Sequence, residues 1–342
     1  MAEPIDIREL NARIESQTGF LTDLRTGMAT TIVGQKHLVD SLLIGLLADG
    51  HILLEGVPGL AKTLAIKTLA SLVDAGFSRI QFTPDLLPAD VVGTMIYSPS
   101  TEKFSVKRGP VFAHFVLADE INRAPAKVQS ALLEAMAERQ VSMGGRRYQL
   151  PELFMVMATQ NPIEHEGTYN LPEAQLDRFL MYIKIDQPDA ESERKILHLV
   201  RGEEGACGED ISCWQDKGKK FQALDIADIL AARQEVLKVH MSEPIEEYLV
   251  QLIMATRHPE KYDAKLAGFV QFGASPRATI ALDKCAKINA WLDNRDFVTP
   301  EDVHAVVYDV LRHRIILTFE AQAEGVTADE VIGTLLKIVP LP

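Results

Sequence analysis

The stretch that decides the fold runs from residue 52 to residue 63 and reads Ile-Leu-Leu-Glu-Gly-Val-Pro-Gly-Leu-Ala-Lys-Thr. Its beginning is a short apolar strand, and its end is a glycine-containing loop whose Lys62 and Thr63 open a helical pattern. A strand, a glycine loop and a helix in this order are the setting of a phosphate-binding loop. The backbone N–H groups of such a loop turn inward around phosphates at the positive end of the helix.

The residue types of this loop suit nucleotide phosphates. Lys62 can neutralise the β- and γ-phosphates, and the Thr63 hydroxyl can reach Mg²⁺. The general pattern has Gly where this chain has Ala61, and Ala fits there if its φ angle is negative. The alternative is a glycine turn that matches the pattern by coincidence. The loop residues concerned are Gly56, Val57, Pro58, Gly59, Leu60, Ala61, Lys62 and Thr63.

Paired carboxylates follow a second apolar strand, which we expect over residues 113–118. Because the carboxyl ends of parallel strands share one edge of a sheet, Asp119 can meet the phosphate loop. Asp119 suits a metal ion, and Glu120 suits the activation of an attacking water. Solvated acids at a strand end are the alternative, and the nearby lysine loop argues against it.

A polar amide follows the next apolar strand, expected over residues 153–158. Asn161 would lie between Glu120 and a γ-phosphate, where its amide could orient the water. Asn161-Pro162 also favours a turn, and the two interpretations are compatible.

Up to about residue 187 the sequence alternates between strand and helix patterns. Besides the strands named above, we expect a strand over residues 51–54, another over 79–82, and helices over 38–48, 63–73 and 126–138. This alternation predicts an α/β fold whose parallel sheet is flanked by helices on both faces. Two inserted hairpins are expected, one pairing 94–97 with 103–106 and the other pairing 140–143 with 146–150 around Gly144-Gly145.

The chain from residue 188 to residue 342 is predicted to be a mainly helical second domain, after an α/β domain of residues 1–187. A polar, acidic stretch over residues 201–222 follows a helix that begins near residue 190. Further helices are expected over 226–239, 244–257, 276–292, 300–317 and 328–338. Ser275-Pro276 and Thr299-Pro300 are typical helix starts, with a capping residue before a proline.

Composition restricts the classes of protein. The 342 residues carry a formal net charge of −13, which argues against broad attraction to nucleic acid or to anionic membranes. The opening MAEPIDIREL is acidic where a secretory signal is basic and then apolar, and no apolar run approaches the ~18 residues of a membrane span. Cys207, Cys213 and Cys285 give no disulfide framework and no zinc pattern. We therefore expect a soluble, cytoplasmic protein without membrane insertion.

Five segments occur in the order found in MoxR-type AAA+ ATPases. They are the phosphate loop, LADEINR (117–123), ATQNP (158–162), LPEAQLDRF (171–179) and GASPRA (273–278). The chain resembles that family over about residues 31–316, and Ala61 matches the family's version of the loop. The resemblance implies a P-loop AAA+ core with two inserted hairpins, followed by a helical lid domain. The same clade holds the magnesium chelatase motor subunit and the minichromosome-maintenance helicases.

The resemblance also implies roles for single residues. Lys62 and Thr63 would be the Walker A pair, with Asp119 and Glu120 as the Walker B pair and Asn161 as sensor 1. The arginines would act from further away: Arg178 as the finger that reaches a neighbouring subunit's γ-phosphate, and Arg277 as sensor 2. The segment that packs on adenine would be Val33, Gly34 and Gln35. Mg²⁺ would be held by Thr63 and Asp119.

The arginines also admit structural readings. Arg178 could form a surface salt bridge with Asp177 or Glu173. Arg277 could simply start a helix, although a cation is poorly placed there unless an anion is present.

Three further arginines stay open between two interpretations. Arg123 could contact nucleotide or a subunit boundary, or could belong to a loop that caps a helix. Arg146 and Arg147, beside a hairpin tip, could touch a substrate or a neighbouring subunit, or could lie in a solvated turn.

The function that the resemblance implies is Mg²⁺-dependent ATP hydrolysis coupled to conformational work in a ring, most simply a hexamer. The protein would act like a chaperone in the maturation or assembly of partner protein complexes. Its client protein would carry a von Willebrand factor A domain. The alternatives are a metal-chelatase-type motor subunit and a nucleotide-gated scaffold without significant turnover. Glu120, Asn161 and Arg178 together argue against the scaffold, and the net charge argues against a nucleic-acid partner.

Overall fold

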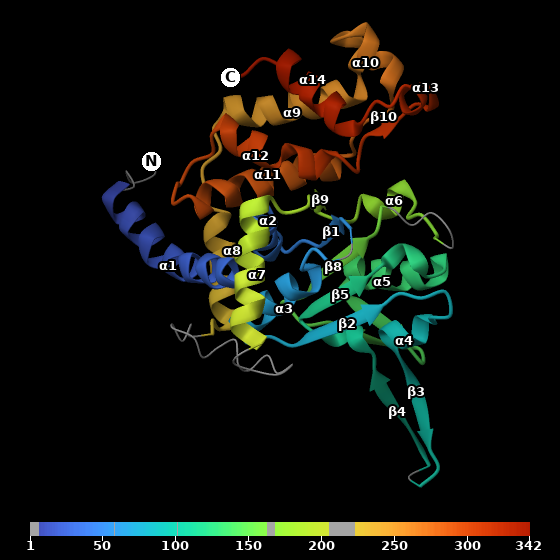
Figure 1. Cartoon of the computed structure of the whole chain (residues 1–342). Helices are drawn as coiled ribbons and strands as arrows, with labels where there is room; N and C mark the ends of the chain where they lie inside the picture. Colours follow the sequence, from blue (N-terminus) through green and yellow to red (C-terminus); the bar gives the residue numbers. More distant parts are fainter. Residues whose placement is uncertain (1–6, 58, 101, 163–167, 205–222) are drawn as a thin grey trace, which may run out of the picture.

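The computed structural model describes residues 7–57, 59–100, 102–162, 168–204 and 223–342 (Figure 1). Pro58, Cys207 and Cys213 therefore lie outside the described residues. Within the described part, no helix is long and apolar enough to cross a lipid bilayer.

A five-stranded parallel sheet forms the centre of the described α/β part, in the order β2-β5-β8-β1-β9. Its strands are β1 (Ile52–Glu55), β2 (Phe77–Gln81), β5 (Phe115–Asp119), β8 (Met155–Gln160) and β9 (Met181–Lys184). Gln81 lies beside Asp119, and Leu54 lies beside Thr159, so the carboxyl ends of these strands meet at one edge. The predicted α/β class is confirmed, whereas strand β9 was not expected from the sequence.

Helices cover both faces of the sheet because neighbouring strand residues point to opposite sides. Leu54 and Leu117 pack in one buried cluster with α2 and α3, whereas Leu53 and Val116 pack in another with α4 and α5. The helices of this part are α1 (Ile7–Thr31), α2 (Lys36–Leu47), α3 (Lys62–Leu72), α4 (Pro88–Val92), α5 (Ala126–Glu138) and α6 (Glu173–Leu176).

Both expected hairpins are present. The longer one, β3 (Gly93–Ser98) with β4 (Lys103–Arg108), projects away from the rest of the molecule (Figure 1). The shorter one pairs β6 (Gln140–Met143) with β7 (Arg146–Gln149) around Gly144 and Gly145, whose φ angles are +55° and +76°. A Cβ on Gly144 would lie 1.8 Å from the Met95 sulfur, so the two hairpins touch where only glycine fits.

The remaining described chain is mainly helical. Its helices are α7 (Ala190–Glu204), α8 (Ile226–Val236), α9 (Glu243–Arg257), α10 (Ala264–Phe269), α11 (Pro276–Leu292), α12 (Pro300–Leu311), α13 (Phe319–Ala323) and α14 (Ala328–Ile338). A small antiparallel sheet, β10 (Val270–Phe272) with β11 (Ile316–Leu317), lies among them. Within the predicted second domain of residues 188–342, we call the described residues 223–342 the lid. The helix expected over residues 300–317 is therefore wrong beyond Leu311, and its last two residues form β11.

The early end of α12 has a tertiary cause. Arg312 donates a hydrogen bond to the carbonyl oxygen of Tyr182 at 2.7 Å, and His313 contacts the carbonyl of Phe179 at 3.2 Å. Arg314 also donates to the Phe179 carbonyl, at 2.6 Å. The lid is thus attached to the backbone around the start of β9 by consecutive side chains.

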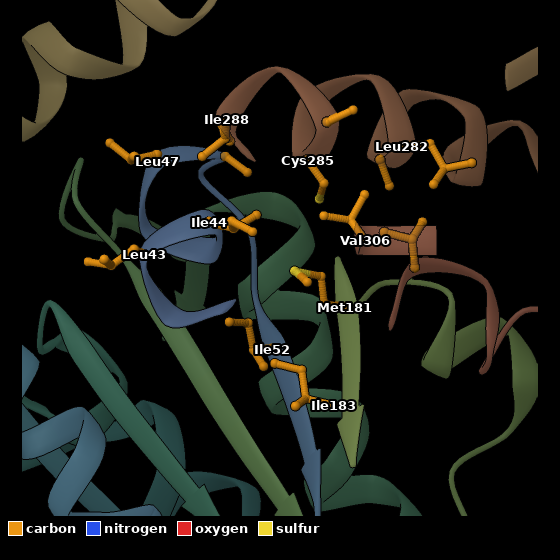
Figure 2. Packing of buried hydrophobic residues seen from close by; sticks show 14 of the residues in the cluster. Leu43, Ile44, Leu47, Ile52, Met181, Ile183, Leu282, Cys285, Ile288 and Val306 are labelled. Atoms are coloured by element: carbon orange, nitrogen blue, oxygen red, sulfur yellow. The ribbon is translucent and has the colours of Figure 1, made fainter. Parts of the chain in front are cut away.

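The lid shares a hydrophobic core with the sheet. Figure 2 shows Leu282, Cys285 and Ile288 of α11 above Ile44 of α2 and Met181 of β9. All of these side chains are buried, so no water layer separates lid and sheet at this contact. Burial also raises the pKa of the Cys285 thiol to about 12, which makes it unreactive at neutral pH.

Candidate functional site

Lys62 begins α3 directly after the glycine loop. Its ammonium donates a hydrogen bond to the carbonyl oxygen of Gly56 at 2.5 Å, so the side chain folds back over the loop. Burial lowers the pKa of Lys62, while Asp119, Glu120 and Glu55 oppose that shift by their negative charge. The lysine is therefore within electrostatic reach of the carboxylates that the sequence predicted beside it, and Thr63 follows in the same helical turn.

Ala61 does not meet the condition under which alanine was said to fit the loop, a negative φ angle. Its φ and ψ angles are +53° and +22°, in the left-handed region. For an alanine this conformation costs about 1–2 kcal/mol. Glu120 has the same kind of backbone, with φ at +55°. The described backbone is thus strained at the loop and again at the carboxylate pair, as is common at functional sites.

Thr159 joins the two carboxylate residues. Its hydroxyl donates to Asp119 Oδ1 at 2.7 Å and accepts from the backbone N–H of Glu120 at 2.9 Å. The side chain is buried at the carboxyl end of β8, next to β5. Asn161, the expected sensor, is also buried and lies just beyond the end of the same strand.

The Glu120 carboxylate is held by side chains on either side of it. Gln81 Nε2 donates to Glu120 Oε2 at 2.7 Å, and Arg123 Nε lies 3.2 Å from the same oxygen. Arg123, whose role was left open, is therefore a partner of Glu120. Both oxygen contacts fix the position of the carboxylate beside the end of β5.

Asp119 pairs with Arg79 of strand β2. Arg79 Nη2 and Nε lie 2.5 and 3.2 Å from Asp119 Oδ2, while Oδ1 takes the Thr159 hydroxyl. The described residues contain no cluster of three or more His, Cys, Asp or Glu side chains that could cage a metal. One carboxylate and one hydroxyl fit Mg²⁺, which usually takes few protein ligands together with substrate phosphates. Thr63 and Asp119 thus supply suitable donors.

A hollow of about 310 Å³ lies beside the expected adenine segment. It is lined by Gly34, Gln35, His37 and Leu38 together with residues 183–189. Gly34 has a φ of +74°, and a Cβ there would lie 2.4 Å from the Ser192 hydroxyl, so this turn requires glycine. Gln35 Nε2 donates to the Asp186 carbonyl at 3.1 Å, and half-buried Val33 precedes the turn.

His37, in the same hollow, reaches the lid. Its Nε2 lies 2.8 Å from Asp309 Oδ2, on α12. This hydrogen bond raises the pKa of His37 above its ordinary value.

Arg178 and Arg277 lie at the surface and make different contacts. Arg178 Nη1 donates to the Leu133 carbonyl of α5 at 2.9 Å. Arg277, near the start of α11, lies 3.4 Å from Asp177 Oδ2. Asp177 is therefore the anion beside this helix start, and in this structure it pairs with lid arginines rather than with Arg178. Arg146 and Arg147 are exposed on β7.

Several functional neighbours were missed from the sequence. Thr159 stands in a quoted motif, but its two hydrogen bonds depend on β5 lying next to β8. Arg79 and Gln81 are two residues apart on β2, and this spacing places both on one face of the strand. Glu55, just before the loop, accepts a hydrogen bond from the Tyr182 hydroxyl, and burial raises its pKa. Only the strand-period signal at Arg79 and Gln81 was readable in advance.

The chain has clear relatives among known proteins. Residues 51–181 match the ATPase family associated with various cellular activities (AAA), and residues 266–335 match the AAA lid domain. The chain is 49% identical over 312 residues to Chaperone MoxR1 of Mycobacterium tuberculosis, covering 91% of this chain and 79% of that protein. It is 32% identical over 351 residues to Protein MoxR of Methylorubrum extorquens, covering 98% and 96%.

A solved structure agrees with these matches. The crystal structure of a presumed ATPase from Cytophaga hutchinsonii is similar to this fold, with a TM-score of 0.87 at 45% identity. The similarity covers 99% of this chain and 100% of that one, so it extends over both the sheet and the lid.

Proposed function

This chain belongs to the MoxR-type AAA+ ATPases, and from that premise we propose that it hydrolyses ATP with Mg²⁺ in a ring of identical subunits. The cycle would drive a chaperone-like change of shape in partner protein complexes. The proposed division is an α/β nucleotide-binding core of residues 1–187 and a helical lid domain of residues 188–342. The similarity to the relative named Chaperone MoxR1 supports the proposed chaperone-like role.

One observation carries the proposal. The negative charges of Asp119 and Glu120 act on the Lys62 ammonium at the carboxyl edge of the sheet, and Thr159 bonds the Asp119 carboxylate at 2.7 Å and the Glu120 backbone N–H at 2.9 Å. A cation for phosphates, a metal ligand and a base for water are thus gathered beside a helix N-terminus. Phosphoryl transfer needs this combination of charge stabilisation and positioning.

The loop residues bind the triphosphate. The Lys62 ammonium leaves the Gly56 carbonyl for the β- and γ-phosphate oxygens, where a charged acceptor gives a stronger hydrogen bond. Thr63 and Asp119 would hold Mg²⁺, which would supply charge neutralisation for the transferred phosphoryl group. Asp119 keeps its orientation through Thr159, and its other oxygen is shared with Arg79. Gly34 and Gln35 would border the adenine in the adjoining hollow.

Glu120 activates the water. To take a proton from it, the carboxylate exchanges its contacts with Gln81 and Arg123 for the water molecule. While those contacts persist, Gln81 and Arg123 occupy the carboxylate oxygen Oε2. Asn161, buried beyond the end of β8, would orient the water.

The arginines complete the site from a distance. Arg178 would act on the nucleotide of a neighbouring subunit, and Arg277 would bring the lid to the nucleotide of its own subunit. A finger supplied by a neighbour implies a head-to-tail contact, which closes into a ring when the rotation between subunits allows it. We propose a hexamer and a protein client with a von Willebrand factor A domain.

The test compares phosphate release and ATP binding in the wild type, Glu120→Gln and Lys62→Ala. The wild type should release phosphate, and Glu120→Gln should bind ATP normally while turning over very slowly. Lys62→Ala should lose nucleotide binding, because the phosphates lose their main counter-charge. Turnover in Glu120→Gln equal to that of the wild type would show that another group activates the water. No turnover in the folded wild type with Mg²⁺ would overturn the proposal.

A further inference from the structure

Protein groups already use most of the hydrogen-bonding capacity of the Asp119 carboxylate. A carboxylate offers about four lone-pair positions, or about two on each oxygen. Arg79 Nη2 and Nε lie 2.5 and 3.2 Å from Oδ2, and the Thr159 hydroxyl lies 2.7 Å from Oδ1. A single guanidinium therefore fills both positions of Oδ2, whereas Oδ1 is shared with a neutral hydroxyl.

The contact between Arg79 and Asp119 follows from the register of the sheet. Strands β2 and β5 are parallel neighbours, and the register partner of Asp119 is Gln81, at the end of β2 (Figure 1). Arg79 lies two residues before that end, so its long side chain runs along the strand toward the carboxyl edge. Gln81 Oε1 accepts a further hydrogen bond from Arg79 Nη2 at 2.9 Å. The guanidinium is thus directed at the carboxylate by its own strand.

The two partners differ in their access to water. The Asp119 side chain is 15% exposed, whereas the Arg79 side chain is 50% exposed. Glu120 follows Asp119 directly, so two negative charges lie side by side where one of them is largely removed from water. An unpaired charge in such a place is costly, and Arg79 supplies the counter-charge. Because Arg79 is half exposed, water can take over its hydrogen bonds when another cation replaces it.

We propose that Arg79 and Mg²⁺ compete for Oδ2 of Asp119. Arg79 is then a positioning residue that neutralises the carboxylate in the metal-free protein and yields this oxygen to the ion. Thr159 keeps its bond to Oδ1 throughout, so the carboxylate holds its orientation while one cation replaces the other. Arg79 consequently lowers the affinity of the site for the metal. This inference rests on the proposed role of Asp119 as a metal ligand and adds a residue that sets the metal affinity.

The first test is Arg79→Met, which removes the guanidinium and keeps a long, unbranched side chain. Mn²⁺ serves as the probe, since it takes the same oxygen ligands as Mg²⁺ and its free form is counted by electron paramagnetic resonance. The titration uses the complex with a non-hydrolysable ATP analogue. Affinity for Mn²⁺ should rise about two- to fivefold, the range expected from the loss of a partly exposed ion pair. A purely structural defect at the sheet edge would lower this affinity instead.

Arg123→Met is the matched control. Arg123 also places a guanidinium beside the carboxylate pair, but its ion pair is with Glu120, with Nε 3.2 Å from Oε2. The substitution removes the same charge from the site without freeing Oδ2 of Asp119, so it should raise Mn²⁺ affinity less than Arg79→Met does. Arg79→Lys keeps the positive charge and should bring the affinity back toward that of the wild type. Equal gains in Arg79→Met and Arg123→Met would overturn the competition, as would no gain in Arg79→Met.

A second measurement leaves the sequence unchanged. Phenylglyoxal modifies arginine side chains, and mass spectrometry follows the rate at each arginine in the wild-type complex with the ATP analogue. Addition of Mg²⁺ should speed the modification of Arg79, because its guanidinium is released from Asp119. Arg25, which pairs with Asp40 at 2.7 Å, should react at a constant rate and serves as the internal control.

The outcomes separate this inference from the proposed function. An unchanged rate at Arg79 in a complex that binds Mn²⁺ would overturn the competition and leave the metal site in place. A folded wild-type complex that binds no Mn²⁺ would overturn the proposed metal site, and the inference with it.

Discussion

Thr159 offers a sharp test of the site's geometry through the substitution Thr159→Val. The change keeps the shape of the side chain and removes the hydroxyl that bonds Asp119 and the Glu120 N–H. A hydrogen bond to a charged group is worth about 1.5–3 kcal/mol, and an unpaired N–H costs about 1–3 kcal/mol. Both hydrogen bonds of the Thr159 hydroxyl are only partly buried, because Asp119 and Glu120 are partly exposed. We therefore take the lower values and expect a loss of about 2–3 kcal/mol in the free energy of unfolding.

The same substitution should lower kcat. Without the bridge, the Asp119 carboxylate is no longer held to the Glu120 backbone, and a small misplacement can reduce turnover about a hundredfold. ATP affinity should change little, because Lys62 and the loop remain. Urea unfolding and phosphate release measure the two effects. Thr159→Ser is the control, because it keeps the hydroxyl and loses a methyl worth about 1 kcal/mol. Equal kcat and equal stability in the two variants would refute the bridging role.

Three further predictions follow from local geometry and assembly. Ala61→Gly should leave the free energy of unfolding unchanged or raise it by up to about 1 kcal/mol. Glycine relieves the left-handed strain at this position, and this gain outweighs the greater conformational freedom that glycine gives to the unfolded chain. A clear loss of stability in urea unfolding would contradict that geometry. Asp309 raises the pKa of His37 above 6.5, so their bond stabilises the fold fully below pH 6.5 and is lost as pH rises through the raised pKa. His37→Gln should remove this pH dependence from the unfolding free energy, and an unaltered dependence would count against the pair. Arg178→Ala mixed with Lys62→Ala should recover ATPase activity, because some interfaces join an intact loop to an intact finger; inactivity at every ratio in assembled mixtures would argue against rescue between subunits.

The strand, glycine loop and helix around Lys62, and the place of the carboxylate pair at the sheet edge, could be predicted because their signal is local. A strand, a glycine loop and a lysine are adjacent in sequence, and parallel strands bring their carboxyl ends together wherever the sheet forms. The order of the motifs then identified the family, which the relatives confirm. The backbone of Ala61 was not predictable in this way, because its φ angle depends on how the loop meets α3.

Contacts between distant residues were not predictable. Arg79 reaches Asp119 from the neighbouring strand, which lies 40 residues earlier in the sequence, and Arg314 reaches Asp177 from 137 residues later. Helical periodicity continued past Leu311, but Arg312 and the residues after it bind the β9 region and end the helix. In these cases tertiary hydrogen bonds outweighed the local pattern, and a single sequence carries no record of the partner.

The central claim, an ATPase whose sites are shared between subunits, is tested most directly by wild-type specific activity across a dilution series. Light scattering at each concentration would report the state of assembly. If Arg178 serves a neighbour's nucleotide, activity per subunit should be constant while rings persist and should fall toward zero as they dissociate. A specific activity that stays flat down to the monomer would contradict the claim.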